Sequence, residues 1–175
     1  MDTMAGNITF SNKATFDRQD DNKYYLNWYS QLIFPDLQSD YKVRVSTTQG
    51  KRGAILARDG TALAITGDDG KRQYPYGKIT SHLLGYVRSI SAEELEANSG
   101  KGYTESSIIG KTGLEKIYEN RLKPGTGCEI YITNSSGNKV KTLAKTEENN
   151  GETITTTIDI RLQDKIYKQF HKREV

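Results

Sequence analysis

The chain has 175 residues, which predicts one domain or two small ones and is long enough to bury a hydrophobic core. Hydrophobic residues make up 34% of the chain. Lysine and arginine (25) nearly balance aspartate and glutamate (22), and no run of five like charges occurs, which excludes a strong nucleic-acid footprint and a polybasic membrane patch. The single cysteine, Cys128, excludes an intramolecular disulfide, and no stretch approaches the roughly 18 apolar residues of a transmembrane helix.

The first forty residues predict a hairpin and a connector. Residues 8–10 and 14–16 carry β-type side chains, residues 17–22 form a polar turn, and an aromatic run returns at 24–29. Pro35 then starts a connector that ends near residue 40, where we place a domain boundary. We expect the aromatic side chains of the run to pack into a core rather than stack on sugars or bases: Tyr24, Tyr25, Trp28 and Tyr29.

Short strands are expected next, at residues 42–46, 54–56 and 62–65. Asp59-Gly60 supplies a tight turn between the last two. Residues 66–71 are polar and rich in glycine, which indicates a loop or a graft.

Helices and strands mix in the second half. Ser91 and Glu94 fit a capping box that opens a helix through residue 97, apolar spacing predicts one amphipathic helix over 113–122, and a final helix is expected over 160–170. Residues 128–133 and 139–145 predict a hairpin, to which 152–158 adds a third strand. Because no regular β-α-β rhythm is present, the fold class is α+β.

Two motifs suggest chemistry that their surroundings do not support. Gly110-Lys111-Thr112 lacks the glycine that a phosphate loop needs at position 105, and Lys111-Thr112-Gly113 spells a triad of serine acyl-enzymes without a fitting Ser-x-x-Lys. The formal matches at Ser39 and Ser136 fall in a connector and at a hairpin tip. We therefore expect no catalytic residue, and the few Cys and His residues predict no metal site.

Five phrases in order carry a family resemblance. They are Asn-Trp-Tyr-Ser-Gln-Leu-Ile-Phe-Pro at 27–35, the Arg-Gly phrase at 52–64, Tyr-Pro-Tyr-Gly-Lys to Gly-Tyr-Val at 74–87, Gly-Lys-Thr-Gly-Leu-Glu-Lys-Ile-Tyr at 110–118, and Thr-Ile-Asp-Ile-Arg-Leu-Gln at 157–163. In these the chain resembles the class B penicillin-binding proteins, and most closely their low-affinity branch, which includes the methicillin-resistance transpeptidase.

The resemblance implies a division of the chain. Residues 1–40 would be the end of an N-terminal, nuclear-transport-factor-like extension with a connector, and residues 41–175 the dimerisation or pedestal domain, an elongated α+β fold of short strands and helices with a terminal hairpin. The residues that the resemblance marks as structural hallmarks are Arg52, Gly53, Arg58, Asp59, Gly60, Tyr74, Pro75, Gly77, Gly85, Gly113, Glu115, Tyr118 and Asp159.

Three departures from the family pattern matter. The chain ends at Val175, before the penicillin-binding domain would begin, so the family's catalytic serine and lysine are expected to be absent. Only nine residues separate Ala64 from Tyr74, where the branch carries a much longer excursion, which indicates an engineered shortcut or a naturally reduced lobe. Ala57 stands where the hallmark has an aspartate.

Arg52 and Arg58 offer planar forks for carboxylates, and Asp59 and Glu115 are the candidate partners in a structural ion-pair network. The family implies no cofactor.

The expected function is a non-catalytic pedestal that positions a D,D-transpeptidase for peptidoglycan cross-linking. It would lie at the extracytoplasmic face of the bacterial membrane and contact the parent's own transpeptidase domain and other cell-wall proteins. The alternative is an allosteric module that recognises peptidoglycan, and its candidate contacts are Thr47, Gln49, Lys51, Lys71 and Arg72.

Overall fold

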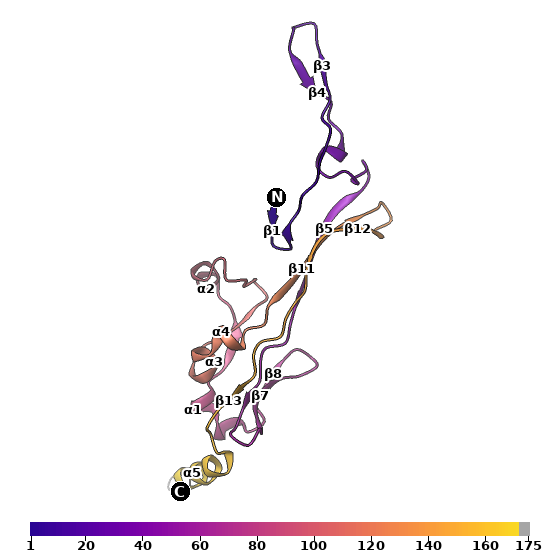
Figure 1. Cartoon of the computed structure of the whole chain (residues 1–175). Coiled ribbons are helices and arrows are strands. Elements are labelled where there is room, and N and C mark those ends of the chain that lie inside the picture. The colour runs from indigo at the N-terminus through magenta and orange to yellow at the C-terminus, as the bar shows by residue number, and fades with distance from the viewer. Residues whose placement is uncertain (172–175) are drawn as a thin grey trace. The chain divides into compact units, whose positions relative to one another are not determined.

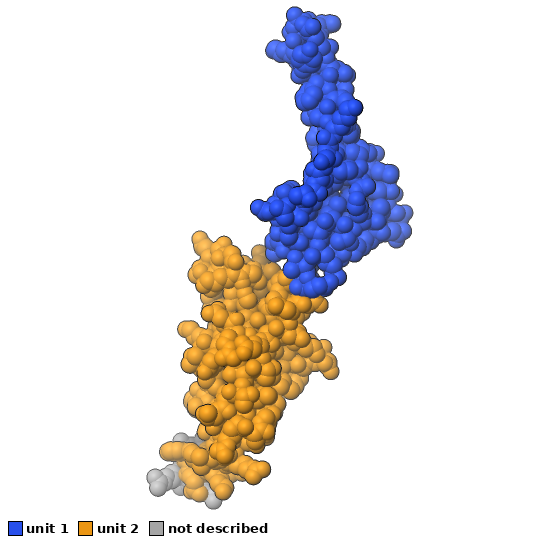
Figure 2. Space-filling view, viewed as in Figure 1, with its two compact units in different colours: residues 1–48, 127–147 blue, residues 49–126, 148–175 orange. Residues whose placement is uncertain are grey.

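The structure is a computed structural model that describes residues 1–171. The chain divides into two compact units (Figure 2). Unit 1 combines residues 1–48 with residues 127–147, and unit 2 combines residues 49–126 with the chain from Glu148 onward. The predicted boundary near residue 40 stays a prediction.

Unit 1 is built from short β-ladders and one larger sheet (Figure 1). Its core gathers apolar residues from the N-terminal segment and from the larger sheet: Ala5, Ile8, Phe34, Leu37, Cys128, Ile130 and Ile132. The larger sheet has the order β12-β11-β5. The elements are β1 (Asp2–Thr3), β2 (Gly6–Asn7), β3 (Phe16–Arg18), β4 (Tyr24–Leu26), the 3-10 helix η1 (Ser30–Leu32), β5 (Lys42–Gln49), β11 (Thr126–Thr133) and β12 (Lys139–Thr146).

The predicted hairpin of β11 and β12 is confirmed, but its third strand is not residues 152–158. β5 takes that place, and the 152–158 segment contributes to another sheet. Strand patterns identify a strand but not its neighbour, because both segments have the same local β-preference.

The N-terminal hairpin exists, but its aromatic face is exposed. β3 pairs with β4, so Phe16 lies opposite Leu26, and the predicted strand at 8–10 is not formed. Next to this ladder, Asn27 Nδ2 donates to Asp17 Oδ2 at 3.0 Å. Phe16, Tyr24 and Trp28 are 57%, 68% and 68% exposed, and Tyr25 and Tyr29 are exposed as well. The expectation of a buried aromatic face was wrong, because among the described residues no second layer covers this two-stranded ladder.

Unit 2 contains a four-stranded sheet with the order β13-β6-β7-β8, in which β13 runs parallel to β6. Gly60, at φ 84°, makes the predicted turn between β6 and β7. The 66–71 segment closes the next hairpin, because the Gly67 N–H donates to the Lys71 carbonyl at 2.9 Å. The strands of unit 2 are β6 (Ile55–Leu56), β7 (Ala62–Thr66), β8 (Arg72–Gln73), β9 (Val87–Ser89), β10 (Ile108–Gly110) and β13 (Ile154–Thr155).

Helices pack beside this sheet. The Ser91–Glu94 capping box is present, as predicted. The single helix expected over 113–122 is instead two, since Tyr118 has non-helical backbone angles of φ −101° and ψ 18°. The helices are η2 (Gly77–Ile79), α1 (Ser81–Leu84), α2 (Ala92–Ala97), α3 (Gly113–Ile117), α4 (Glu119–Leu122) and α5 (Ile160–His171). Within residues 1–171, no helix has the length and apolar character needed to cross a membrane.

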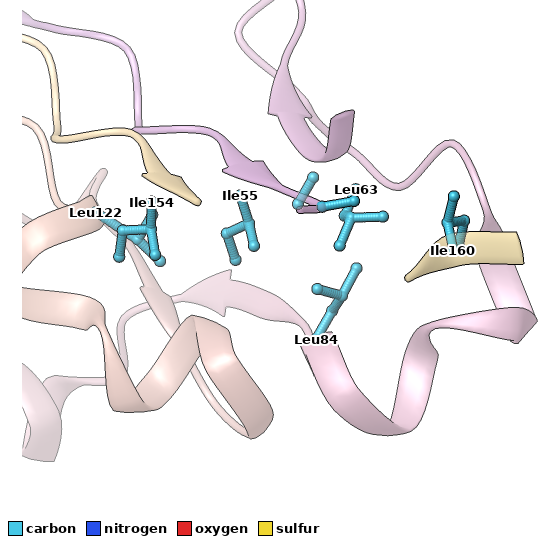
Figure 3. Close-up of a cluster of buried hydrophobic side chains, with 8 residues drawn as sticks. Ile55, Leu63, Leu84, Leu122, Ile154 and Ile160 are labelled. Carbon is cyan, nitrogen blue, oxygen red and sulfur yellow. The ribbon is translucent and has the colours of Figure 1, made fainter. Parts of the chain in front are cut away.

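The core of unit 2 lies where the sheet meets these helices (Figure 3). Ile55 and Leu63 from the sheet are fully buried against Leu84 and Leu122, and each such side chain contributes about 1.5–3 kcal/mol on burial. Ala57, which stands where the family hallmark has an aspartate, is also fully buried. Because alanine carries no charge, this position needs no cationic partner in the core. The remaining members are Ala64, Ile154 and Ile160.

Candidate functional site

A buried ion-pair network joins the sheet of unit 2 to its helices. Arg52 Nε donates to Glu115 Oε2 at 2.8 Å, and Arg72 Nε donates to Glu115 Oε1 at 2.7 Å. Arg52 Nη2 reaches Glu119 Oε2 at 2.7 Å. The Arg52, Arg72 and Glu115 side chains are 1%, 2% and 0% exposed. Two cations and two anions therefore neutralise one another where water has little access.

Neutral groups complete the network. Glu119 accepts from the Gly110 N–H and the Tyr103 hydroxyl, both at 2.9 Å, and Arg72 Nη1 donates to the Gly53 carbonyl at 2.8 Å. Each carboxylate is thus held by several donors, which is the condition for tolerating a buried charge.

The pKa values reflect this environment. Burial, reinforced by the Glu115 charge, raises the pKa of Tyr74 to about 12. Burial and the hydrogen bond to Glu119 likewise raise the pKa of Tyr103. Burial alone would lower the pKa of Arg52, but its contacts with Glu119 and Glu115 outweigh that effect and raise it. The phenols therefore stay protonated and the guanidinium stays charged at neutral pH.

The prediction of partners was half right. Glu115 is the partner of Arg52, but Asp59 pairs with neither arginine. Arg58 instead lies 3.4 Å from Asp159, and Asp59 accepts the Thr61 N–H in the turn at 3.0 Å. Asp59 is adjacent to Arg58 in the sequence, whereas the true partner, Asp159, is about a hundred residues away and comes close only in the folded chain.

Glu119 and Tyr103 were missed as members of the network. Glu119 comes four residues after Glu115 in the sequence, and this i, i+4 pair of carboxylates within the helix predicted over 113–122 was the available signal. Tyr103 lies in an irregular segment, and nothing in its local sequence marks it.

Two hallmark glycines have a steric reason. A Cβ on Gly53 would collide with the Glu152 carbonyl, so the close approach of the two backbone segments beside Arg52 requires glycine. Gly85 adopts φ 73° against the Thr112 carbonyl. The other hallmarks lie at junctions: Pro75 and Gly77 between β8 and α1, Gly113 at the start of α3, and Tyr118 between α3 and α4.

A cleft adjoins the network, with a volume of about 310 Å³. Lys51 and Asp68 form an ion pair of 2.8 Å at this cleft, and Arg52 also lines it, with its Nη1 left without a hydrogen-bond partner in the described structure. The lining residues are Gln49, Gly50, Lys51, Arg52, Thr66, Asp68, Gly70, Ile108 and Pro124.

Of the predicted peptidoglycan contacts, Gln49 and Lys51 line this cleft. Lys71 follows Gly70 in the exposed turn, and Thr47 lies exposed on β5 in unit 1. The prediction that Arg72 contacts peptidoglycan was wrong, because its side chain is buried against Glu115 and belongs to the ion-pair network rather than to an open contact surface. The described residues contain no group of three or more His, Cys, Asp or Glu side chains placed to hold a metal ion.

Comparison with known proteins identifies the family. Residues 65–156 match the sequence model of the "Penicillin-binding Protein dimerisation domain". Penicillin-binding protein 3 of Bacillus subtilis is 27% identical over 246 aligned positions, covering 97% of this chain and 36% of that protein. Peptidoglycan D,D-transpeptidase MrdA of Salmonella typhimurium is 38% identical over 99 positions, covering 54% of this chain and 16% of its own length.

Solved structures agree on the fold. Pseudomonas aeruginosa PBP2, in complex with WCK 5153, superposes with a TM-score of 0.52 at 28% identity, over 69% of this chain and 24% of that one. PBP2 of Helicobacter pylori, in a complex with MreC, gives a TM-score of 0.64 at 20% identity, over 75% and 39%. The chain thus spans less than two fifths of the length of each relative named here. Because the family match covers residues 65–156, which is more than half of the 175 residues and includes Arg72, Glu115 and Glu119 of the buried network, the chain belongs to the penicillin-binding protein dimerisation domain family.

Proposed function

We propose that the chain is the non-catalytic pedestal of a class B penicillin-binding protein of the low-affinity, methicillin-resistance type. Its role is to hold a D,D-transpeptidase domain in position for peptidoglycan cross-linking at the extracytoplasmic face of the membrane, and to offer surfaces to other cell-wall proteins. The observation that carries the proposal is the dimerisation-domain match over residues 65–156. The complex of Helicobacter pylori PBP2 with MreC supports a protein partner.

Two further observations support details of the proposal. The buried ion-pair network ties the sheet of unit 2 to its helices, as a spacer requires. The alignment with the Bacillus relative runs over 246 positions, more than the 175 residues of this chain, so that relative carries residues that this chain lacks. We place the missing residues at the tight 66–71 turn.

A chimera separates positioning from chemistry. This chain would replace the corresponding region of Bacillus subtilis penicillin-binding protein 3, with and without Glu115→Gln. We expect both chimeras to be acylated by fluorescent penicillin at the same rate, while only the unmodified one supports cross-linking in cells. Equal cross-linking by both would contradict a positioning role. The isolated chain itself should take no penicillin label.

The cleft beside Arg52 favours a second candidate, recognition of peptidoglycan. Gln49 and Lys51 line it, and the lysine ammonium and the glutamine amide match the carboxylates and amides of stem peptides. The test is an amide-resolved NMR titration with soluble uncrosslinked peptidoglycan fragments. Saturable shifts at residues 49–52 and 66–71, lost in Lys51→Ala, would favour recognition. No shifts at millimolar ligand would leave the pedestal role alone.

A further inference from the structure

Among the strands of residues 1–171, β13 forms an open edge of the unit 2 sheet. Its even-numbered residues bond to β6: the N–H groups of Ile154 and Thr156 donate to the carbonyls of Ala54 and Leu56, each at 2.8 Å, and the Ile158 carbonyl accepts from Arg58 at 3.0 Å. Because backbone groups alternate in direction along a strand, the N–H and C=O groups of the intervening residues, Thr155 and Thr157, face away from the sheet. Both residues are exposed.

A groove runs along this edge, with a volume of about 360 Å³. The strand forms one wall, and the other is made by Leu83, Leu114 and Tyr118 from the helices. Every lining side chain is uncharged: Leu83, Leu114, Tyr118, Ile154, Thr155, Thr156, Thr157 and Ile158. A charged group entering the groove would lose hydration without gaining a partner, so the lining favours an apolar occupant.

We propose that this groove is a strand-addition site for a partner protein, which inserts an extended, uncharged segment with an apolar side chain at every second position. The segment's backbone pairs with Thr155 and Thr157, which sets its extended conformation, and its apolar side chains contact Leu83 and Tyr118. Open sheet edges are usually blocked by charge or proline, and threonine at both outward positions leaves this one available. The proposal is independent of peptidoglycan recognition, which concerns a different cleft.

The probe is a capped octapeptide, Lys-Thr-Val-Thr-Leu-Thr-Val-Lys, titrated into the isotope-labelled chain. Its uncharged centre, Thr-Val-Thr-Leu-Thr-Val, is the segment meant for the groove, and the terminal lysines keep the peptide soluble. We expect saturable NMR shifts at Leu83 and residues 155–157, and slower hydrogen exchange of the Thr155 and Thr157 amides at saturation. Exchange distinguishes backbone pairing from mere contact of apolar side chains. Shifts without slower exchange, or no shifts at millimolar peptide, would overturn the proposal.

Three variants sharpen the test. Thr155→Pro removes an outward N–H while leaving the bonds to β6, a position where an edge strand tolerates proline, so we expect a folded chain that no longer binds. Leu83→Glu should also abolish binding, whereas Leu162→Glu, at an exposed leucine outside the groove, should not. Unchanged binding by Thr155→Pro would refute strand addition. A second copy of the chain is the rival occupant of this edge, and analytical sedimentation of the free chain tests for it. A dimer in which the Thr155 amide is already protected from hydrogen exchange would assign the edge to that second copy and overturn the proposal.

Discussion

Glu115→Gln tests whether the buried network stabilises unit 2 through charge. The substitution keeps the shape of the side chain but leaves the guanidinium groups of Arg52 and Arg72 with one carboxylate fewer. The Glu115 side chain is 0% exposed, so water cannot replace the lost charge. Removing one partner of a buried ion pair typically costs about 3–5 kcal/mol, because the remaining charge is left uncompensated.

For a chain of this size each kcal/mol shifts the melting temperature by about 2–4 °C, so we expect a fall of roughly 6–20 °C. The measurement is chemical and thermal unfolding followed by far-UV circular dichroism. Glu152→Gln is the matched control, since that carboxylate pairs with Arg121 but is 57% exposed. Solvent already screens such a pair, so the control should lose far less stability.

A loss no larger in Glu115→Gln than in Glu152→Gln would refute the reasoning. It would mean that the network relaxes around the amide or admits water. A double-mutant cycle of Glu115→Ala with Arg72→Ala would then give the coupling between the two side chains directly. We expect that coupling to be clearly favourable.

Gly53→Ala should destabilise the chain by about 1–3 kcal/mol in urea unfolding, because the added Cβ meets the Glu152 carbonyl; an unchanged midpoint would contradict the close approach. The raised pKa of Tyr74, about 12 against 10.0, means that the folded state holds its proton more tightly. Stability should therefore fall as the pH rises from 10 to 12, and less steeply in Tyr74→Phe; equal slopes in thermal melts would argue against it. Trp28, the only tryptophan, should emit as in water and be quenched by iodide equally before and after unfolding, whereas a blue-shifted native emission would show that it is covered.

Local signals in the sequence determined much of unit 2. The Asp-Gly turn at Gly60, the Ser91 capping box and the strands at 54–56 and 62–65 were predicted correctly, because each depends on residues a few positions apart, whereas the two- and three-residue strands β8, β9 and β10 were not predicted. The same holds for the helix at 160–170. The family could likewise be identified from short sequence phrases. Several of these contain a glycine that the fold requires, at the turn of Gly60 and at the close backbone contacts of Gly53 and Gly85.

Tertiary structure decided the partners. Arg52 meets Glu115 across 63 residues, Arg58 meets Asp159 across about a hundred, and the 152–158 segment pairs with β6 rather than with the β11–β12 hairpin. These choices depend on how chain segments pack, and single-sequence patterns carry no information on packing between distant segments. The aromatic hairpin makes the same point in reverse. Its residues have the composition of a buried face, but burial requires a second layer, and whether one is present is a property of the tertiary structure and not of the strand itself.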